Sequence, residues 1–458
     1  MMKKVESHVF NTARWHNTCK VAEYGEGAYV YDSEGKCYLD AIGGTHVISI
    51  GHGVPEIAEA IAEQTRKLCF LHKAQFTSEP QEKLADTVVE MAPEEMDRVG
   101  FVTSGSTANE MAYQVALLYH QLRGKVRKSK IISRWHGYHG HTVATIGMSG
   151  SMFVKGSNLP ICEALKFPRI QPPHCYQCPY GLTYPSCELA CAKELARTIE
   201  QEKPDTVAAF IAEPIIGGAG SAIVPPPGYY ETIRKICDFY DVLFISEEVL
   251  TGFGRTGKNF GIQHWKAIPD IITATKGLSS GYAPIGAVIV RQKVREIFDR
   301  ATENIALSLF TYAGHPISCA VALAVLKYIS KHNLIERCGT MGKYLKTQLQ
   351  KLREREPLIG NVRGEGLLVG LEFVQNQDTH KPFPRSLHIT ETIMKTGLEN
   401  GLILRGRFGT GTGLDGDHIL ISPPFIITES ECDELVSKLE LTLKQVKQSL
   451  NLVVCTQL

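Results

Sequence analysis

The chain has 458 residues, of which 43% are hydrophobic and 21% are charged, the composition of a globular protein that buries large cores. Lysine and arginine total 49 against 48 for aspartate and glutamate, so no global field recruits nucleic acid or anionic lipid. We therefore expect a small-molecule partner, with no nucleic acid and no membrane.

Two features bear on the compartment. Residues 1–8 are basic, but no apolar run of a secretory signal follows them, and no later stretch is apolar enough to span a bilayer. Thirteen scattered cysteines fit a reducing environment better than a disulfide framework. We expect a cytoplasmic protein.

In chain order, the first expected element is a hairpin over residues 29–40, where two alternating runs flank a Ser-Glu-Gly turn. From about residue 80 to 330, short apolar runs alternate with longer amphipathic segments. This alternation predicts a mostly parallel sheet covered by helices on both faces. The expected strands are residues 130–133, 206–212, 242–246, 271–275 and 287–290, and the expected helices are 82–91, 108–122, 229–240 and 316–330.

The last third of the chain predicts a different layout. Helices are expected over 341–353 and 391–398, strands over 367–373 and 418–422, and a final helix from Thr428, with Glu431 completing a capping box. We expect an α/β fold with a large domain over residues 66–330. A small α+β domain is expected from both termini, residues 1–65 and 331–458.

Three groups that carry chemistry are expected at one edge of the sheet. Ser104-Gly105-Ser106 opens a helix, either as an ordinary cap or as a site for one phosphate. Glu247 ends an apolar strand, and Lys276 ends the next one, where burial makes an amine nucleophilic. Ligands of open α/β sheets bind at such strand ends, so the sequence predicts an active site there.

These residues resemble the class III aminotransferases, pyridoxal phosphate (PLP) enzymes of fold type I that act on ω-amino groups. The resemblance runs from about Tyr24 to the last helix. It implies a large domain with a mostly parallel, seven-stranded type of sheet. The motifs that carry it are Ser104-Gly105-Ser106, Trp135 to Gly140, Ala212-Glu213-Pro214, Glu248 to Gly257, Thr275-Lys276-Gly277 and Phe310 to Pro316.

The resemblance implies roles for individual residues around PLP. Lys276 forms the Schiff base and moves the substrate proton, and Gly105 and Ser106 bind the cofactor phosphate. Thr311 adds a hydroxyl to that phosphate from the partner subunit. We therefore expect a homodimer with shared active sites, and a tetramer stays open.

The resemblance also places residues around the cofactor ring. Tyr138 stacks on one face and Val249 covers the other. Glu247 stands where the family has Asp as counter-ion of the ring nitrogen. Its extra methylene predicts either a compensating shift of the strand or a weaker electron sink, and we expect Glu247→Asp to preserve or raise turnover.

Substrate preference is expected to follow from two departures and from one arginine that matches the family. Gly218 stands where related enzymes that use 2-oxoglutarate carry Glu, which favours pyruvate as acceptor. Arg405 resembles the arginine that binds a substrate carboxylate, with Arg407 as a rival. His46 stands where an aromatic residue often lines the substrate pocket, which suggests a different donor.

A cysteine cluster, Cys175, Cys178, Cys187 and Cys191, has the composition of a surface loop, with a helix expected over 188–200. Four thiolates can chelate zinc, but free or packed thiols are the expected state, and no catalytic metal is expected.

The expected activity is transamination from an ω-amino acid or amine to a keto acid, with pyruvate as the favoured acceptor, through pyridoxamine phosphate. Two alternatives stay open: other PLP chemistry, such as aminomutase or racemase reactions, and a PLP-binding protein with little turnover.

Overall fold

The structure is a computed structural model that describes residues 19–152, 154, 165–301, 310–411 and 414–452. The basic start of the chain, residues 1–8, lies outside the described residues. Within the described ranges, no helix has the length and apolar character that crossing a bilayer requires.

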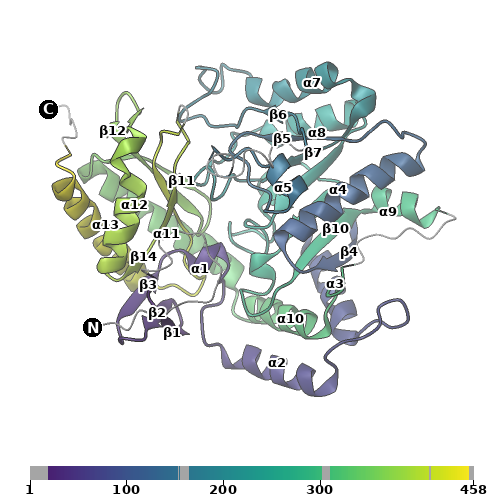
Figure 1. Cartoon of the computed structure of the whole chain (residues 1–458), viewed down its shortest axis with the longest axis horizontal. Helices are drawn as coiled ribbons and strands as arrows, with labels where there is room; N and C mark the ends of the chain where they lie inside the picture. Colours follow the sequence, from purple (N-terminus) through teal and green to yellow (C-terminus); the bar gives the residue numbers. More distant parts are fainter. Residues whose placement is uncertain (1–18, 153, 155–164, 302–309, 412–413, 453–458) are drawn as a thin grey trace.

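A seven-stranded sheet forms the centre of the molecule, as expected (Figure 1). Its order is β4-β10-β9-β8-β7-β5-β6, and all pairs are parallel except those of β10, which runs antiparallel to both neighbours. The three central strands β7, β8 and β9 are buried along their whole length. The strands are β4 Met96–Val102, β5 Lys130–Arg134, β6 Arg169–Ile170, β7 Val207–Ala212, β8 Leu243–Glu248, β9 Ile271–Ala274 and β10 Gly286–Arg291.

Helices cover both faces of this sheet because successive strand side chains point to opposite sides. Phe210 and Phe244 belong to one apolar cluster, and their neighbours Ile211 and Ile245 belong to the other. The helices of this region are α2 Pro55–Lys67, α3 Glu79–Met91, α4 Gly105–Leu122, α5 Val143–Met148, α7 Ala190–Glu202, α8 Tyr229–Phe239, α9 Gln292–Asp299 and α10 Pro316–Lys331.

The two ends of the chain share a second sheet. Strand β14 (Leu402–Ile403) pairs in parallel with β3 (Cys37–Asp40), which continues through β2 (Tyr29–Asp32) to β1 (Ala22–Glu26). Figure 1 shows these strands beside the C-terminal helices. A third sheet contains β11 Ile359–Gly364, β12 Val369–Asn376, β13 Lys381–Pro382, β15 Arg405–Arg407 and β16 His418–Ile421, and the remaining helices are α1 Gly43–His46, α11 Leu334–Arg355, α12 Ile389–Glu399 and α13 Glu429–Ser449.

Local signals at the helix ends agree with the sequence. Thr428 caps α13, and its side chain and that of Glu431 form the predicted capping box. The helix expected from residue 188 begins later, at Ala190, because Glu188 and Leu189 adopt positive φ angles of 46° and 58°.

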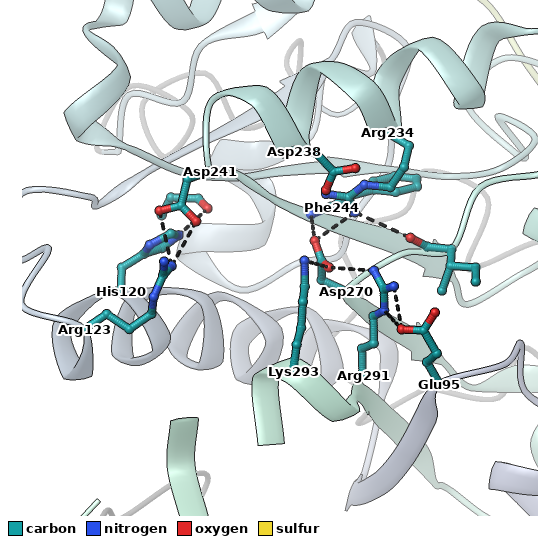
Figure 2. A network of polar contacts seen from close by, with 12 residues as sticks. Glu95, His120, Arg123, Arg234, Asp238, Asp241, Phe244, Asp270, Arg291 and Lys293 are labelled. Atoms are coloured by element: carbon teal, nitrogen blue, oxygen red, sulfur yellow. Dashed lines mark hydrogen bonds and ion pairs between the residues drawn. The ribbon is translucent and has the colours of Figure 1, made fainter. Parts of the chain in front are cut away.

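An ionic network closes the amino-terminal end of the central strands (Figure 2). Asp270, which precedes β9 and is fully buried, accepts from the Phe244 N–H at 2.8 Å. Arg234 and Lys293 approach the same carboxylate at 2.9 and 2.5 Å. This end of the sheet is therefore occupied by structural ion pairs, and the opposite end is left for ligands.

Candidate active site

A cavity of about 550 Å³ lies at the carboxyl-terminal end of β8 and β9. It collects the predicted site residues His46, Gly105, Ser106, Tyr138, Glu247, Val249, Lys276 and Arg405, together with Arg407. Thr311 does not line this cavity and is exposed. Its contribution to a partner's site stays a prediction.

The start of α4 forms one wall of the cavity. Ser104 accepts from the Thr107 N–H at 3.2 Å, and the Thr107 hydroxyl accepts from the Ser104 N–H at 2.9 Å, which completes the cap. The N–H groups of Gly105 and Ser106 have no acceptor within the described part of the chain. Gly140 lies against them, since a Cβ there would be 2.5 Å from Ser106 Oγ. The positive end of the helix thus presents free donors to an anion.

Lys276 follows β9 and is half-buried in a left-handed conformation, with φ of 43°. The N–H groups of Ser279 and Ser280 donate to its carbonyl and hold the turn. Burial lowers the pKa of the Lys276 amine, although Glu247 and Glu213 oppose the shift. The amine is therefore easier to deprotonate than an exposed lysine and lies among acids at the cavity wall.

Glu247, at the end of β8, is anchored at both oxygens. Its Oε1 accepts from the Val249 N–H at 2.8 Å, and its Oε2 lies 3.3 Å from His139 Nδ1. Burial raises the pKa of Glu247, whereas Lys276 and Arg134 favour its charged form. Burial lowers the pKa of His139 to about 4, so the ring is neutral and its Nδ1–H donates to Glu247.

Asn109 and His139 are functional residues that the sequence reasoning missed. The Asn109 amide donates to the His139 carbonyl at 2.8 Å, and its oxygen accepts from the Thr273 hydroxyl at 2.7 Å. Asn109 therefore ties α4 and β9 to the turn that carries Tyr138. The available signal was a polar residue four positions after Gly105, on the same helix face.

Glu213 belongs to the Ala212-Glu213-Pro214 motif, but the sequence did not predict what its side chain does. Its two carboxylate oxygens accept from the N–H groups of Tyr138 and Gly217 at 3.0 and 2.9 Å. Burial and the neighbouring Glu247 raise the pKa of Glu213 to about 7. Glu213 thus fixes the positions of the Tyr138 turn and of the loop that contains Gly218.

His46 lines the cavity, but one nitrogen of its ring is hydrogen-bonded within the protein. Its Nδ1 is 2.6 Å from Ser422 Oγ, and the Ser422 hydroxyl donates to the Ile42 carbonyl at 3.2 Å. Because that serine proton is used, His46 donates from Nδ1 and its Nε2 is an acceptor. Burial and the nearby cations of Lys276 and Arg405 hold the pKa of His46 well below its usual value.

The four cysteines of the predicted cluster surround one small cavity as free thiols. Burial raises the pKa of Cys191 to about 12 and also raises the pKa of Cys175. Among the residues that the structure describes, no three His, Cys, Asp or Glu side chains are arranged to hold a metal ion.

Comparison with known proteins gives consistent matches over nearly the whole chain. Residues 11–443 match the family model described as aminotransferase class-III. An uncharacterized aminotransferase of Bacillus subtilis, YodT, is 40% identical over 94% of this chain and 96% of its own length. The diaminobutyrate–2-oxoglutarate transaminase of Halomonas elongata is 34% identical, covering 97% and 94%, and the putrescine–pyruvate aminotransferase of Pseudomonas aeruginosa is 36% identical, covering 91% and 89%.

The solved structures agree with this result. The omega transaminase of Pseudomonas jessenii, crystallised in complex with PMP, superposes with a TM-score of 0.88. It has 35% sequence identity, and the match covers 97% of each chain.

Proposed function

The chain belongs to the class III aminotransferases, which are PLP-dependent enzymes, and from this premise we propose that it transfers an amino group from an ω-amino acid or amine to pyruvate. The observation that carries the proposal is that the Lys276 amine shares one cavity with Glu247 and with the free N–H donors of α4. One of the matched relatives is named for 2-oxoglutarate and another for pyruvate, so the acceptor is argued from this chain's own residues.

The residues present fit PLP. The N–H groups of Gly105 and Ser106 suit its phosphate, the amine of Lys276 suits its aldehyde, and Glu247 suits a protonated ring nitrogen. Tyr138 and Val249 line the same space, where an aromatic ring and an apolar side chain would cover the faces of a cofactor ring. When bound, the cofactor accepts electrons from the substrate carbon and carries the amino group between the two substrates.

Lys276 supplies both the attachment point and the proton carrier. Its lowered pKa would provide the neutral amine that holds the cofactor by its aldehyde and yields that place to a substrate amine. The same amine would hold the proton that leaves the substrate carbon. The left-handed turn fixes where this nitrogen can move.

Glu247 would hold the cofactor at its ring nitrogen and would favour the protonated form of that nitrogen. A carboxylate there favours the charged ring, and the neutral His139 stabilises the carboxylate by donating to its second oxygen. Because His139 is itself held through Asn109, the acid is positioned by three segments of the chain.

The loop at Gly218 supports pyruvate as acceptor. A Cβ at Gly218 would meet no atom within 4 Å, so the absence of an acidic side chain leaves open space beside the cavity. Without an acid in that place, Arg405 keeps its charge available to the single carboxylate of pyruvate.

A spectroscopic screen tests the proposal. Holoenzyme is mixed with a panel of amines and ω-amino acids, and conversion of the cofactor to pyridoxamine phosphate is followed, with pyruvate and 2-oxoglutarate as competing acceptors. We expect at least one donor to bleach the cofactor band, pyruvate to restore it fastest, and Lys276→Ala to abolish steady-state turnover.

The products distinguish the alternatives. An aldehyde or ketone formed from the donor in equal amount to alanine supports transamination. An isomerised or racemised amine without such a carbonyl product indicates other PLP chemistry, and a cofactor band that no amine bleaches indicates a protein with little turnover.

A further inference from the structure

Two of the four clustered thiols, those of Cys175 and Cys178, lie on either side of a tight turn. Residues 176 and 177 form this turn. A turn of four residues brings its first and last Cα atoms within about 7 Å, and a disulfide bridges Cα atoms about 4.4–6.8 Å apart. The turn therefore brings the two cysteines close to the separation that a disulfide requires.

The cavity that the four cysteines line shows that the cluster is compact. Its volume is about 20 Å³, which gives room for about one water molecule. Partial burial, then Cys178 and then Cys187, raise the pKa of the Cys175 thiol. Because the repulsion between two thiolates falls with their separation, Cys178 is the thiol most strongly coupled to Cys175.

The turn is held in place by the C-terminal part of the chain. The Tyr176 ring stacks on the His380 ring, with centroids 4.0 Å apart, and the Tyr176 carbonyl accepts from His380 Nδ1 at 3.2 Å. The Tyr176 hydroxyl packs against β11, where a Cβ at Gly360 would be 2.5 Å from it. Since the turn is already ordered, bringing the two thiols together costs little further conformational entropy.

Exposure and charge favour a reaction that begins at Cys175. Cys175 is exposed, whereas Cys191 is half-buried and burial raises its pKa to about 12. A raised pKa leaves less thiolate at Cys175, but each thiolate is then a stronger nucleophile. A disulfide carries no charge, so it suits the partly buried cluster better than neighbouring thiolates that repel each other.

We propose that Cys175 and Cys178 form a reversible dithiol–disulfide site that reacts with low-molecular-weight disulfides, such as oxidised glutathione. The Cys175 thiolate attacks one sulfur of the glutathione disulfide and releases one glutathione, which takes up the proton that Cys175 lost. The Cys178 thiolate then attacks Cys175 Sγ and releases the second glutathione, which takes up the proton of Cys178. Two thiols are oxidised to one disulfide, and one glutathione disulfide is reduced to two thiols.

This site is separate from the transamination proposed above. Neither Cys175 nor Cys178 is among the residues that line the cavity of Lys276. The test below therefore reads thiol chemistry directly and needs no amine donor.

Mass spectrometry of the holoenzyme tests the site. The protein is equilibrated with glutathione buffers of increasing oxidised fraction, the remaining thiols are blocked, and the peptides are mapped. We expect the peptide that contains Cys175 and Cys178 to lose two hydrogen atoms and to escape blocking, and dithiothreitol to reverse the change. Cys178→Ser should instead trap a mixed disulfide between Cys175 and glutathione, because the second thiol is missing.

Three further variants are the controls. Cys69→Ser removes an exposed cysteine outside the cluster, and Cys187→Ser and Cys191→Ser remove the other two thiols of the small cavity. We expect the disulfide between Cys175 and Cys178 to form in all three. The absorbance of bound cofactor shows that each variant, including Cys178→Ser, keeps its fold.

The outcomes decide for or against the pair. A disulfide within the Cys175 peptide that becomes a mixed disulfide in Cys178→Ser supports the site. Thiols that stay open to blocking in every glutathione buffer, or a disulfide from Cys175 to Cys187 or Cys191, overturn it. One zinc ion per chain in protein purified without added metal also overturns it, because the thiolates would then be metal ligands.

Discussion

Glu247 is one methylene longer than the Asp that the family resemblance implies at this position, and its hydrogen bonds show how the longer side chain fits. Its Oε1 turns back to the Val249 N–H, two residues on, and its Oε2 reaches His139. An aspartate can also accept from an N–H two residues later in the chain. We propose that the carboxylate charge matters more than the extra methylene, because a negative charge there would favour a protonated cofactor nitrogen.

We therefore expect Glu247→Gln to slow the donor half-reaction on the order of a hundredfold, the cost of removing one preorganised electrostatic group. Glu247→Asp keeps the charge and should retain or exceed wild-type turnover. Stopped-flow bleaching with the best donor measures both rates, and cofactor content checks that the sites are loaded. An equal loss in the two variants would show that the pocket requires the length of Glu.

At the scale of elements, the amino-terminal ends of the central strands carry ion pairs that hold the fold, and their carboxyl-terminal ends line the cavity. The network around Asp270 joins the starts of β8 and β9 to α8 and α9 through Arg234 and Lys293 (Figure 2). Because Asp270 is fully buried, the surrounding cations lose their counter-charge when it is neutralised. This end fixes the strands whose other ends carry Glu247 and Lys276.

Asp270→Asn should lower the free energy of unfolding by about 3–5 kcal/mol, the cost of breaking a buried ion pair. Chemical denaturation of the holoenzyme measures the change. Lys83→Ala is the matched control, since its ion pair with Glu79 is exposed and should shift the midpoint far less. Equal shifts in the two variants would contradict a structural role for the network.

At the scale of the whole molecule, an exposed aromatic group lies beside Thr311. The rings of Phe70 and Tyr312 are 5.9 Å apart, with exposed fractions of 43% and 61%, and His315 contacts both. Exposed apolar patches of this kind mark interaction surfaces. Because Thr311 is predicted to serve a partner's cofactor, we propose that a second copy of the chain covers this group.

Phe70→Asp should weaken the dimer and reduce cofactor content, because a buried charge is costly at an apolar contact. Mass photometry across a dilution series reports the oligomer, and absorbance reports bound cofactor. Phe239→Asp is the control, since Phe239 is 80% exposed on α8 and lies outside this group. A wild-type monomer with full cofactor content would overturn the shared site.

Local patterns were enough to predict the central strands, the cap at Ser104 and the meeting of Glu247 with Lys276 at one sheet edge. Each depends on periodicity, on cap chemistry or on the rule that parallel strands end together. The domain boundaries at residues 65 and 330 stay predictions, because chain position alone does not divide a packed core.

Contacts between distant segments were decided only by the tertiary structure. The pairing of β3 with β14, the donation from His139 to Glu247 and the bridge through Asn109 each join residues separated by tens or hundreds of positions. The sequence left Arg405 and Arg407 as rivals, and the register of β15 against β16 places both in the cavity. Side-chain type and spacing determined which chemistry this protein carries, whereas packing of the chain's two ends determined which groups face the substrate.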